Sequence, residues 1–327
     1  MDCSVVICCY NSVQRISHTL DYLSKQQVNE AIKWEIVLVD NNSNDGTSLF
    51  ASKLWLQLKK PVLLKIVHET KVGLSNARMR GVKEAKGEII IFCDDDNWLT
   101  NNYISEVCSV MSRNNIIGAL GGKSIAKTDS NFLPDWFDEY KIGYAIGEQH
   151  DNVGYLPKFK LLFGAGLAIR KKLINIAYRD FPALLQDRNG NKLSSGGDSE
   201  ICLRLTLMNY KLYYDSSLLF YHYIPAYRLT EEYRDKLWKG LQLSSSLLND
   251  YISIIAFVHK INGSKNSLLI KSTVKLILSM FITNTKWSKI EQMHKFIYLT
   301  GISLGNVDDD ISKILKIARK LHKYSLY

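Results

Sequence analysis

The segment Glu88–Asn97 constrains the fold of this 327-residue chain more than any other. A wholly apolar run from Ile89 to Cys93 ends in three consecutive carboxylates, Asp94, Asp95 and Asp96. Such a short run, partly β-branched and aromatic, is typical of a buried strand in a parallel sheet. Adjacent carboxylates repel one another, and burial raises that cost. We therefore expect them at the carboxyl edge of the strand, where α/β sheets bind ligands and a cation can neutralise them. A solvated acidic turn is the alternative.

The rest of the first part of the chain alternates between strand and helix patterns. Apolar runs predict strands at 4–9, 34–39, 63–68, 117–122, 163–169 and 211–220. Helical spacing of apolar residues predicts helices at 13–24, 50–58, 73–85 and 102–113, with a further helix from Asp198. Thr47 and Ser75 are expected to cap two of these helices. This alternation predicts an α/β fold with a parallel sheet and right-handed crossovers.

Charge divides the chain into two parts. Residues 229–327 hold 15 Lys+Arg and 8 Asp+Glu, a net charge of +7 out of the total of +10. We therefore predict a domain at 1–228 and a basic, helical C-terminal region at 229–327. Within this region, a polar stripe at 267–279 and an amphipathic helix at 311–323 indicate contact with an anionic membrane. A solvated basic face is the simpler alternative.

The cysteines and the chain start indicate the compartment. Six cysteines occur without a CxxC pair, which favours buried thiols in a reducing environment over a disulfide framework or a zinc site. The first residues lack the basic n-region of a signal peptide, and no apolar window reaches the length of a membrane span without charge. We expect a cytoplasmic protein, at the inner face of the cell membrane if the basic region binds lipid.

Polar groups follow three of the predicted parallel strands and are expected to share one edge of the sheet: Tyr10-Asn11, Asp40 to Asn42, and Asp94 to Asp96. A carboxylate such as Asp40 is suited to accept hydrogen bonds from a ribose or a base. Asp94 and Asp96 offer oxygen ligands of the kind that Mg²⁺ or Mn²⁺ uses to bridge phosphates. The chain has neither a GxxxxGK[ST] loop nor a GxGxxG after the first strand. A nucleotide held by carboxylates and a metal is the pattern that remains.

Six motifs, in order, resemble those of the inverting family 2 glycosyltransferases of the GT-A fold. They cover about residues 3–230: Val5–Asn11, Ile36–Thr47 (similar to "VDdgStDgT"), Gly73–Arg78, Asp94–Leu99 (the DxD region), Gly196–Arg204 (similar to "GeD-xE-xxxR") and Tyr221–Arg228. The resemblance implies a mostly parallel, Rossmann-like sheet flanked by helices. The sequence departs from the family pattern at Asn97, where many members have an acid, and at Gly197, where a Glu is common. These departures leave the outer metal ligands open.

The resemblance also implies roles for individual residues. Asp198 would be the general base that takes the proton from an acceptor hydroxyl. The nucleotide-sugar donor, a UDP-sugar by expectation, would contact Tyr10, Asn11, Asp40, Asn42, Arg78, Asp94, Asp95, Gly164 and Gly166. Asp94 and Asp96 would hold Mn²⁺ or Mg²⁺, with His222 as a further candidate ligand. Trp136 and Glu200 would contact a glycan or lipid-linked acceptor in cell-surface polysaccharide synthesis, and no nucleic acid partner is expected.

Each role has a structural alternative. Asp198 could only cap its helix, His222 and Trp136 could be packing residues, and Arg204 and Arg228 could form ion pairs. Two other functions also stay open, a nucleotidyltransferase and a catalytically silent nucleotide-sugar-binding or membrane-associated scaffold. The first would need a Gly-rich basic loop after the first strand, where Tyr10-Asn11-Ser12 stands. Retention of Asp40, Asp94, Asp96 and Asp198 together disfavours the second.

Overall fold

A computed structural model of the chain describes residues 1–59, 61–130, 132–185, 187–188, 194–260, 286–302 and 309–325. The chain divides into two compact units. The first comprises Met1–Cys202 and Lys211–Ser244, and the second comprises Leu203–Tyr210 and Ser245–Tyr327. The helix Glu231–Lys260 contributes residues to both, as does the helix Gly197–Leu207.

The first unit is built on one mixed sheet whose strand order is β3-β2-β1-β4-β8-β6-β9-β5, with β7 paired to β9. Its strands are β1 (Cys3–Cys9), β2 (Trp34–Asp40), β3 (Leu64–His68), β4 (Ile89–Asp94), β5 (Asn97–Leu99), β6 (Ile117–Lys127), β7 (Gly154–Tyr155), β8 (Ala168–Arg170) and β9 (Lys211–Tyr223). The first four are parallel, as the sequence predicts, whereas β8 runs antiparallel to β4 and β6. The predicted strand at 163–169 shortens to β8.

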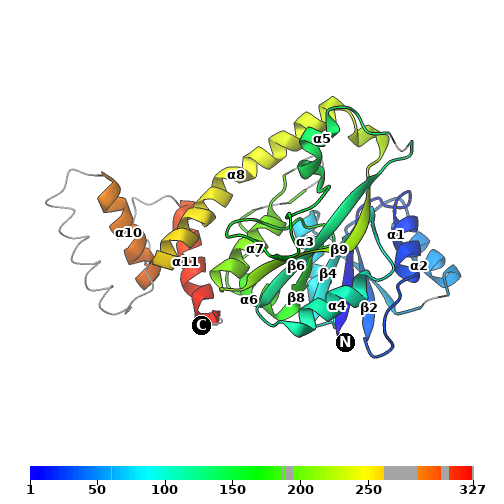
Figure 1. Cartoon of the computed structure of the whole chain (residues 1–327), viewed down its shortest axis with the longest axis horizontal. Coiled ribbons are helices and arrows are strands. Elements are labelled where there is room, and N and C mark those ends of the chain that lie inside the picture. The colour runs from blue at the N-terminus through cyan, green and yellow to red at the C-terminus, as the bar shows by residue number, and fades with distance from the viewer. Residues whose placement is uncertain are drawn as a thin grey trace. The chain divides into compact units, whose positions relative to one another are not determined.

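Helices alternate with the strands from β1 to β4 (Figure 1), and further helices follow later in the described part of the chain. They are α1 (Ile16–Ser24), α2 (Thr47–Gln57), α3 (Leu74–Glu84), α4 (Tyr103–Arg113), α5 (Phe137–Tyr140), α6 (Lys171–Tyr178), α7 (Gly197–Leu207), α8 (Glu231–Lys260), α10 (Lys286–Thr300) and α11 (Asp309–Leu321). The two predicted caps are wrong. Gly46 and Gly73 occupy the N-cap positions of α2 and α3, so Thr47 lies inside its helix and Ser75 points elsewhere.

The two faces of the parallel strands bury different helices. Alternate residues of β1, such as Val5 and Ile7, pack in one core with side chains of α1, α2 and α4. On the opposite face, Gly81 of α3 lies so close to the sheet that a Cβ there would meet Val6 at 2.3 Å. This tight approach of α3 to β1 holds the start of α3 near the carboxyl edge of the sheet, where the acidic residues after β4 lie.

The second unit is helical, as the sequence predicts for the C-terminal region. α11 buries its apolar face, which consists of Ile314, Leu315, Ile317, Ala318 and Leu321. The apolar face that indicated membrane contact is thus already covered, because it packs within the unit. The polar stripe at 267–279 lies outside the described residues. Within this unit, the buried Arg204 donates from Nε to the hydroxyl of Tyr251 over 3.3 Å.

One helix in the described part of the chain, over Glu231–Val258, is long and apolar enough to cross a membrane by length and composition. Core helices of soluble proteins meet the same criterion, so length and composition alone do not assign it to a bilayer. All six cysteines are free.

Candidate active site

A cleft of about 1270 Å³ opens at the carboxyl edge of the parallel strands, within the first unit. Its lining brings together several of the predicted residues: Tyr10, Asn11, Arg78, Asp94, Asp95, Asp96, Gly164, Asp198 and His222. They come from the ends of β1 and β4, from α3, from the turn before β8, from the start of α7 and from β9. The ends of the parallel strands β1 and β4 therefore meet at one edge, as the topology requires. Asp198 and His222, which lie about a hundred or more positions later in the chain, line the same cleft.

The three carboxylates after β4 have three different environments. Asp94 is the most open, with its side chain 30 % exposed, and the nearest cation, Nη2 of Arg78, lies 3.7 Å from its Oδ1. Asp95 turns away toward the first βα connection, and Asp96 is buried beside His222 and Arg228. The acidic turn is therefore not simply solvated, because each carboxylate has a cationic neighbour.

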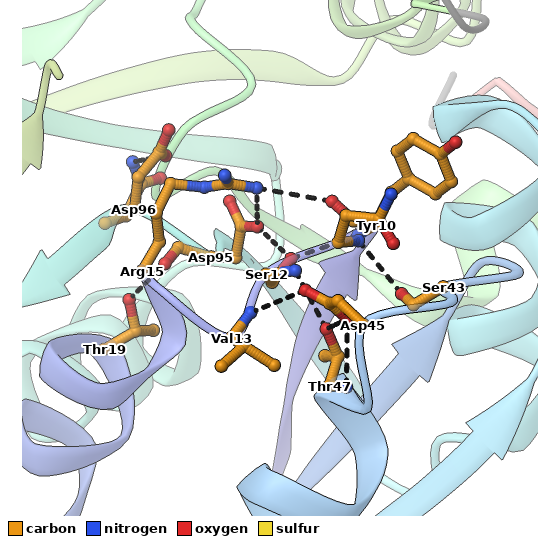
Figure 2. A network of polar contacts seen from close by, with 12 residues as sticks. Tyr10, Ser12, Val13, Arg15, Thr19, Ser43, Asp45, Thr47, Asp95 and Asp96 are labelled. Carbon is orange, nitrogen blue, oxygen red and sulfur yellow. Dashed lines mark hydrogen bonds and ion pairs between the residues drawn. The ribbon is translucent and has the colours of Figure 1, made fainter. Parts of the chain in front are cut away.

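Asp95 anchors the turn that carries Tyr10 and Asn11 (Figure 2). Its Oδ2 accepts hydrogen bonds from Oγ of Ser12 and from Nη2 of Arg15, the latter at 2.7 Å. Its backbone oxygen accepts a further bond from Oγ1 of Thr19 over 2.9 Å. Burial and repulsion from Asp96 raise the pKa of Asp95, while Arg15 and Ser12 oppose that rise. Asp95 thus connects the turn after β4 to the segment that follows β1.

Asp96 lies between two basic side chains. Nη1 of Arg228 donates to its Oδ2 over 2.9 Å, and Nε2 of His222 lies 3.4 Å from its Oδ1. Burial alone would raise the pKa of Asp96, but His222 and Arg228 outweigh it and hold that pKa below its usual range. The pairing of β5 with β9 places Asn97 directly opposite His222, which explains how His222 reaches the acidic turn.

Asp96 and His222 present two donor atoms at a spacing that suits one divalent cation. No cluster of three His, Cys, Asp or Glu side chains in the described ranges could hold a metal on its own. However, two ligands of one Mg²⁺-sized ion lie roughly 3 Å apart, close to the separation of Asp96 Oδ1 and His222 Nε2. Asp94 lines the same cleft, and Mg²⁺ sites of this type take further ligands from the substrate phosphates.

Asp198 lies across the cleft, in the first turn of α7. Its Oδ2 accepts the backbone N–H of Gly164 over 2.8 Å, and its Oδ1 accepts the N–H of Ser199 over 2.8 Å. Burial raises the pKa of this carboxyl, repulsion from Asp187 raises it further, and Arg78 partly offsets both. A raised pKa is what a carboxylate needs to accept a proton near neutral pH.

Arg78 is the cation shared by the carboxylates of the cleft. It lies near Asp94, and its Nη1 is 3.5 Å from Oδ2 of Asp187. A Cβ on Gly164 would meet both Arg78 and Asp198 at 2.9 Å, so a larger residue there would displace the ends of these two side chains. Burial lowers the pKa of Arg78, yet Asp94, Asp187 and Asp198 together hold it above its usual value. The guanidinium therefore stays charged.

Five predicted residues lie outside the lining of the cleft: Asp40, Asn42, Gly166, Glu200 and Trp136. Asp40 is buried in its turn, where Oδ1 accepts the N–H of Ser43, and neither Asp40 nor Asn42 belongs to the lining of the cleft, which takes Asn41 instead. Gly166 lies beneath the hydroxyl of Tyr103, outside the cleft lining.

The two predicted acceptor residues lie away from the cleft wall. Glu200 is fully buried, and its carboxylate accepts the backbone N–H groups of Leu184 and Leu185, because a buried acid requires such partners. Trp136 packs against Phe137 and under the guanidinium of Arg234. Neither residue lines the cleft.

Sequence reasoning missed several residues that the cleft contains. Arg15 is the ion-pair partner of Asp95, the buried Asp187 lies beside Arg78, and Ile142, Tyr227 and Trp238 are exposed apolar side chains on the lining. Asp187 stands in a loop without periodicity, so no local pattern marks it. Tyr227 and Arg228 follow His222 in the last predicted motif, which is the one signal that was present.

Comparison with known proteins identifies the family of the chain. The model of the family "Glycosyl transferase family 2" matches residues 4–173. A dodecaprenyl-phosphate galacturonate synthase of Rhizobium johnstonii is 26% identical over 187 residues, which are 56% of this chain and 54% of that protein. A cholesterol galactosyltransferase of Borreliella burgdorferi is 39% identical over 95 residues, 29% of this chain and 25% of that protein. The chain thus spans a quarter to about half of the length of these curated relatives.

Solved structures share the fold. TarS 1–349 of S. aureus in complex with UDP-GlcNAc superposes with a TM-score of 0.54 at 15% identity, covering 99% of this chain and 91% of that one. The mannosyltransferase PcManGT of Pyrobaculum calidifontis, in complex with GDP-Man and Mn²⁺, gives a TM-score of 0.50 at 16% identity, covering 94% and 88%. These neighbours support the GT-A fold. Because the family model matches more than half of the chain, the protein belongs to glycosyltransferase family 2.

Proposed function

We propose that this protein transfers a sugar from a nucleotide diphosphate donor, a UDP-sugar, to a hydroxyl of an acceptor, with inversion at the anomeric carbon. One observation carries the proposal: the partly buried Asp198, whose pKa is raised, lines the same cleft as Asp94 and Asp96. A base and a diphosphate site facing one cavity is the arrangement that a single displacement needs. The UDP and UDP-GlcNAc in the TarS complexes support the choice of donor.

The donor would lie along the edge of the sheet. Tyr10 is exposed at the end of β1 and offers a ring for the base, while Asn11 offers a polar group beside it. Arg78, near Asp94, would bind the phosphates or the sugar. Asp40 would act on the nucleoside through its turn, because it holds the backbone of Ser43, whose hydroxyl accepts the N–H of Asn11.

A divalent cation would be held by Asp94, Asp96 and His222. When bound, it would supply positive charge at the diphosphate, where the leaving group gains negative charge. Arg228 and Arg15 would hold Asp96 and Asp95 in place from behind. Asp198 would accept the proton of the attacking hydroxyl, and its hydrogen bonds from Gly164 and Ser199 would keep the carboxylate aimed.

The acceptor would approach over the apolar rim of the cleft instead of over Trp136. Ile142, Tyr227 and Trp238 line the cleft with 68%, 58% and 41% of their surface exposed. Such a rim suits the apolar face of a sugar ring or the lipid-proximal part of an acceptor. The names of three relatives include cholesterol, dodecaprenyl-phosphate and diphosphoundecaprenol, which supports a lipid-linked acceptor and work at the inner face of the membrane.

The test is a screen of UDP- and GDP-sugars for nucleotide release, combined with calorimetry of UDP binding with and without Mn²⁺. We expect one UDP-sugar to be turned over and UDP to bind more tightly with the metal. UDP binding without turnover of any donor, with lipid-linked glycans present, would instead identify a nucleotide-sugar-binding scaffold.

A further inference from the structure

Asp187 is a loop residue to which the proposed reaction assigns no role. Its side chain is only 5 % exposed, and its carboxylate contacts two separate helices, α3 and α7. The backbone N–H of Gly197, at the start of α7, donates to its Oδ1 over 2.8 Å. Oγ of Ser75 donates to its Oδ2 over 3.1 Å, and Nη1 of Arg78 lies 3.5 Å from the same oxygen. One carboxylate thus joins the helix that carries Asp198 to the helix that carries Arg78.

Gly197 shows how closely this contact is fitted. A Cβ at position 197 would lie 2.3 Å from Oδ2 of Asp187, so a side chain there would expel the carboxylate. The first N–H groups of a helix have no partner within the helix, and negative charge is stabilising at that end. The carboxylate of Asp187, ten residues earlier in the chain, therefore fills the space that a side chain at position 197 would occupy.

We propose that Asp187 is a positioning residue for the transfer reaction, one that fixes the first turn of α7, and hence Asp198, relative to Arg78. This inference rests on the proposed function, because Asp198 acts as a base only if transfer occurs. Asp187 lies beside Asp198 at the end of the cleft that also borders a smaller, mostly apolar cavity of about 400 Å³. Loss of its carboxylate would free the start of α7 to move into either space.

The charge of Asp187 also acts on Asp198 directly. After burial, repulsion from Asp187 is the largest cause that raises the pKa of Asp198. The other groups facing Asp198 are Arg78, which lowers its pKa, and the thiol of Cys202, whose own pKa is raised to about 12 by burial so that it stays neutral. Removing the negative charge at 187 therefore leaves Arg78 less opposed, and the pKa of Asp198 falls.

The experiment compares wild type with Asp187→Asn, which keeps the shape but removes the charge, and with the control Asp21→Asn on α1. We expect kcat of Asp187→Asn to fall by about tenfold to a hundredfold, as for a misplaced reacting group, with a smaller change in donor KM. The acid limb of its kcat/KM profile moves to lower pH. NMR titration of isotope-labelled aspartate carboxyls shows the same fall in the pKa of Asp198 without any substrate. Asp21→Asn changes neither.

Two further variants keep the inference decidable if Asp187→Asn folds poorly. Gly197→Ala retains the charge but displaces the carboxylate, and Ser75→Ala removes one of its holders. Both are expected to lower kcat while circular dichroism stays unchanged. Wild-type kcat in these variants, or an Asp198 that titrates alike in Asp187→Asn and wild type, overturns the inference. Absence of transfer by the wild type would instead refute the proposed function, so the two failures are distinguishable.

Discussion

Nε2 of His222 lies 3.4 Å from Oδ1 of Asp96, although the two residues are 126 positions apart in the chain. Strand pairing produces this contact, because Asn97 of β5 is directly opposite His222 of β9. The pair presents one oxygen and one nitrogen in the lining of the cleft. The contact therefore leads to a test of the proposed metal site that does not depend on the identity of the sugar donor.

Asp96→Asn and His222→Ala are expected to weaken Mn²⁺-supported UDP binding by at least about tenfold, since even the loss of an outer partner of a metal ligand typically costs that much. Calorimetry with UDP, with and without Mn²⁺, measures the effect. His150→Ala, in a loop away from the cleft lining, is the matched control and should bind as wild type does. Equal affinity with and without metal in the wild type would contradict the assignment.

Asp198→Asn should leave UDP binding within about twofold of wild type and lower turnover by about 10² to 10⁴, the range that general base catalysis supplies. The amide keeps an oxygen that can accept the N–H of Gly164. Turnover is measured by nucleotide release with acceptor at saturation. Near-normal turnover would show that Asp198 only organises the start of α7.

The activity of the wild type should fall as pH drops through the pKa of Asp198. Burial and Asp187 raise this pKa, so the acid limb of kcat/KM should lie above the usual aspartate value of about 3.9. The sign follows because the ionised form is the base, and a raised pKa extends the inactive protonated form to higher pH. An acid limb at the ordinary aspartate value would count against the raised pKa.

Trp238→Ala is expected to raise the acceptor KM about fivefold, equivalent to about 1 kcal/mol for the loss of one stacked ring, with donor KM unchanged. Leu243→Ala is the control, because Leu243 is 74% exposed on the same helix but does not line the cleft. Steady-state kinetics with a lipid-linked glycan measure both variants. A rise in donor KM would instead place Trp238 at the donor site.

Asp95→Ala should destabilise the first unit by about 3 to 5 kcal/mol, because it leaves the largely buried guanidinium of Arg15 without its carboxylate. The double variant Asp95→Ala, Arg15→Ala should lose less than the sum of the single changes, since the two residues interact directly. Urea unfolding measures these energies. Additive losses would mean that the interaction between Asp95 and Arg15 contributes little to stability.

The N-terminal half of the fold could be predicted because its signals are local. Apolar runs specify β1, β2 and β4, and the polar residues after them share one edge by topology alone. The expected strand at 163–169 is mostly turn, because Gly164 and Gly166 serve close contacts with Asp198 and Tyr103. The caps at Thr47 and Ser75 failed since glycines with positive φ already end the preceding loops.

The sequence by itself determined that three carboxylates follow a buried strand and that Asp198 begins a helix, because strand and helix patterns depend on neighbours in the chain. Only the tertiary structure decided which partner each carboxylate has. Asp95 meets Arg15, Asp96 meets His222 and Arg228, and Asp198 lies beside Asp187. These pairings come from strand register and loop packing, and contacts between distant segments leave no periodic trace in the sequence.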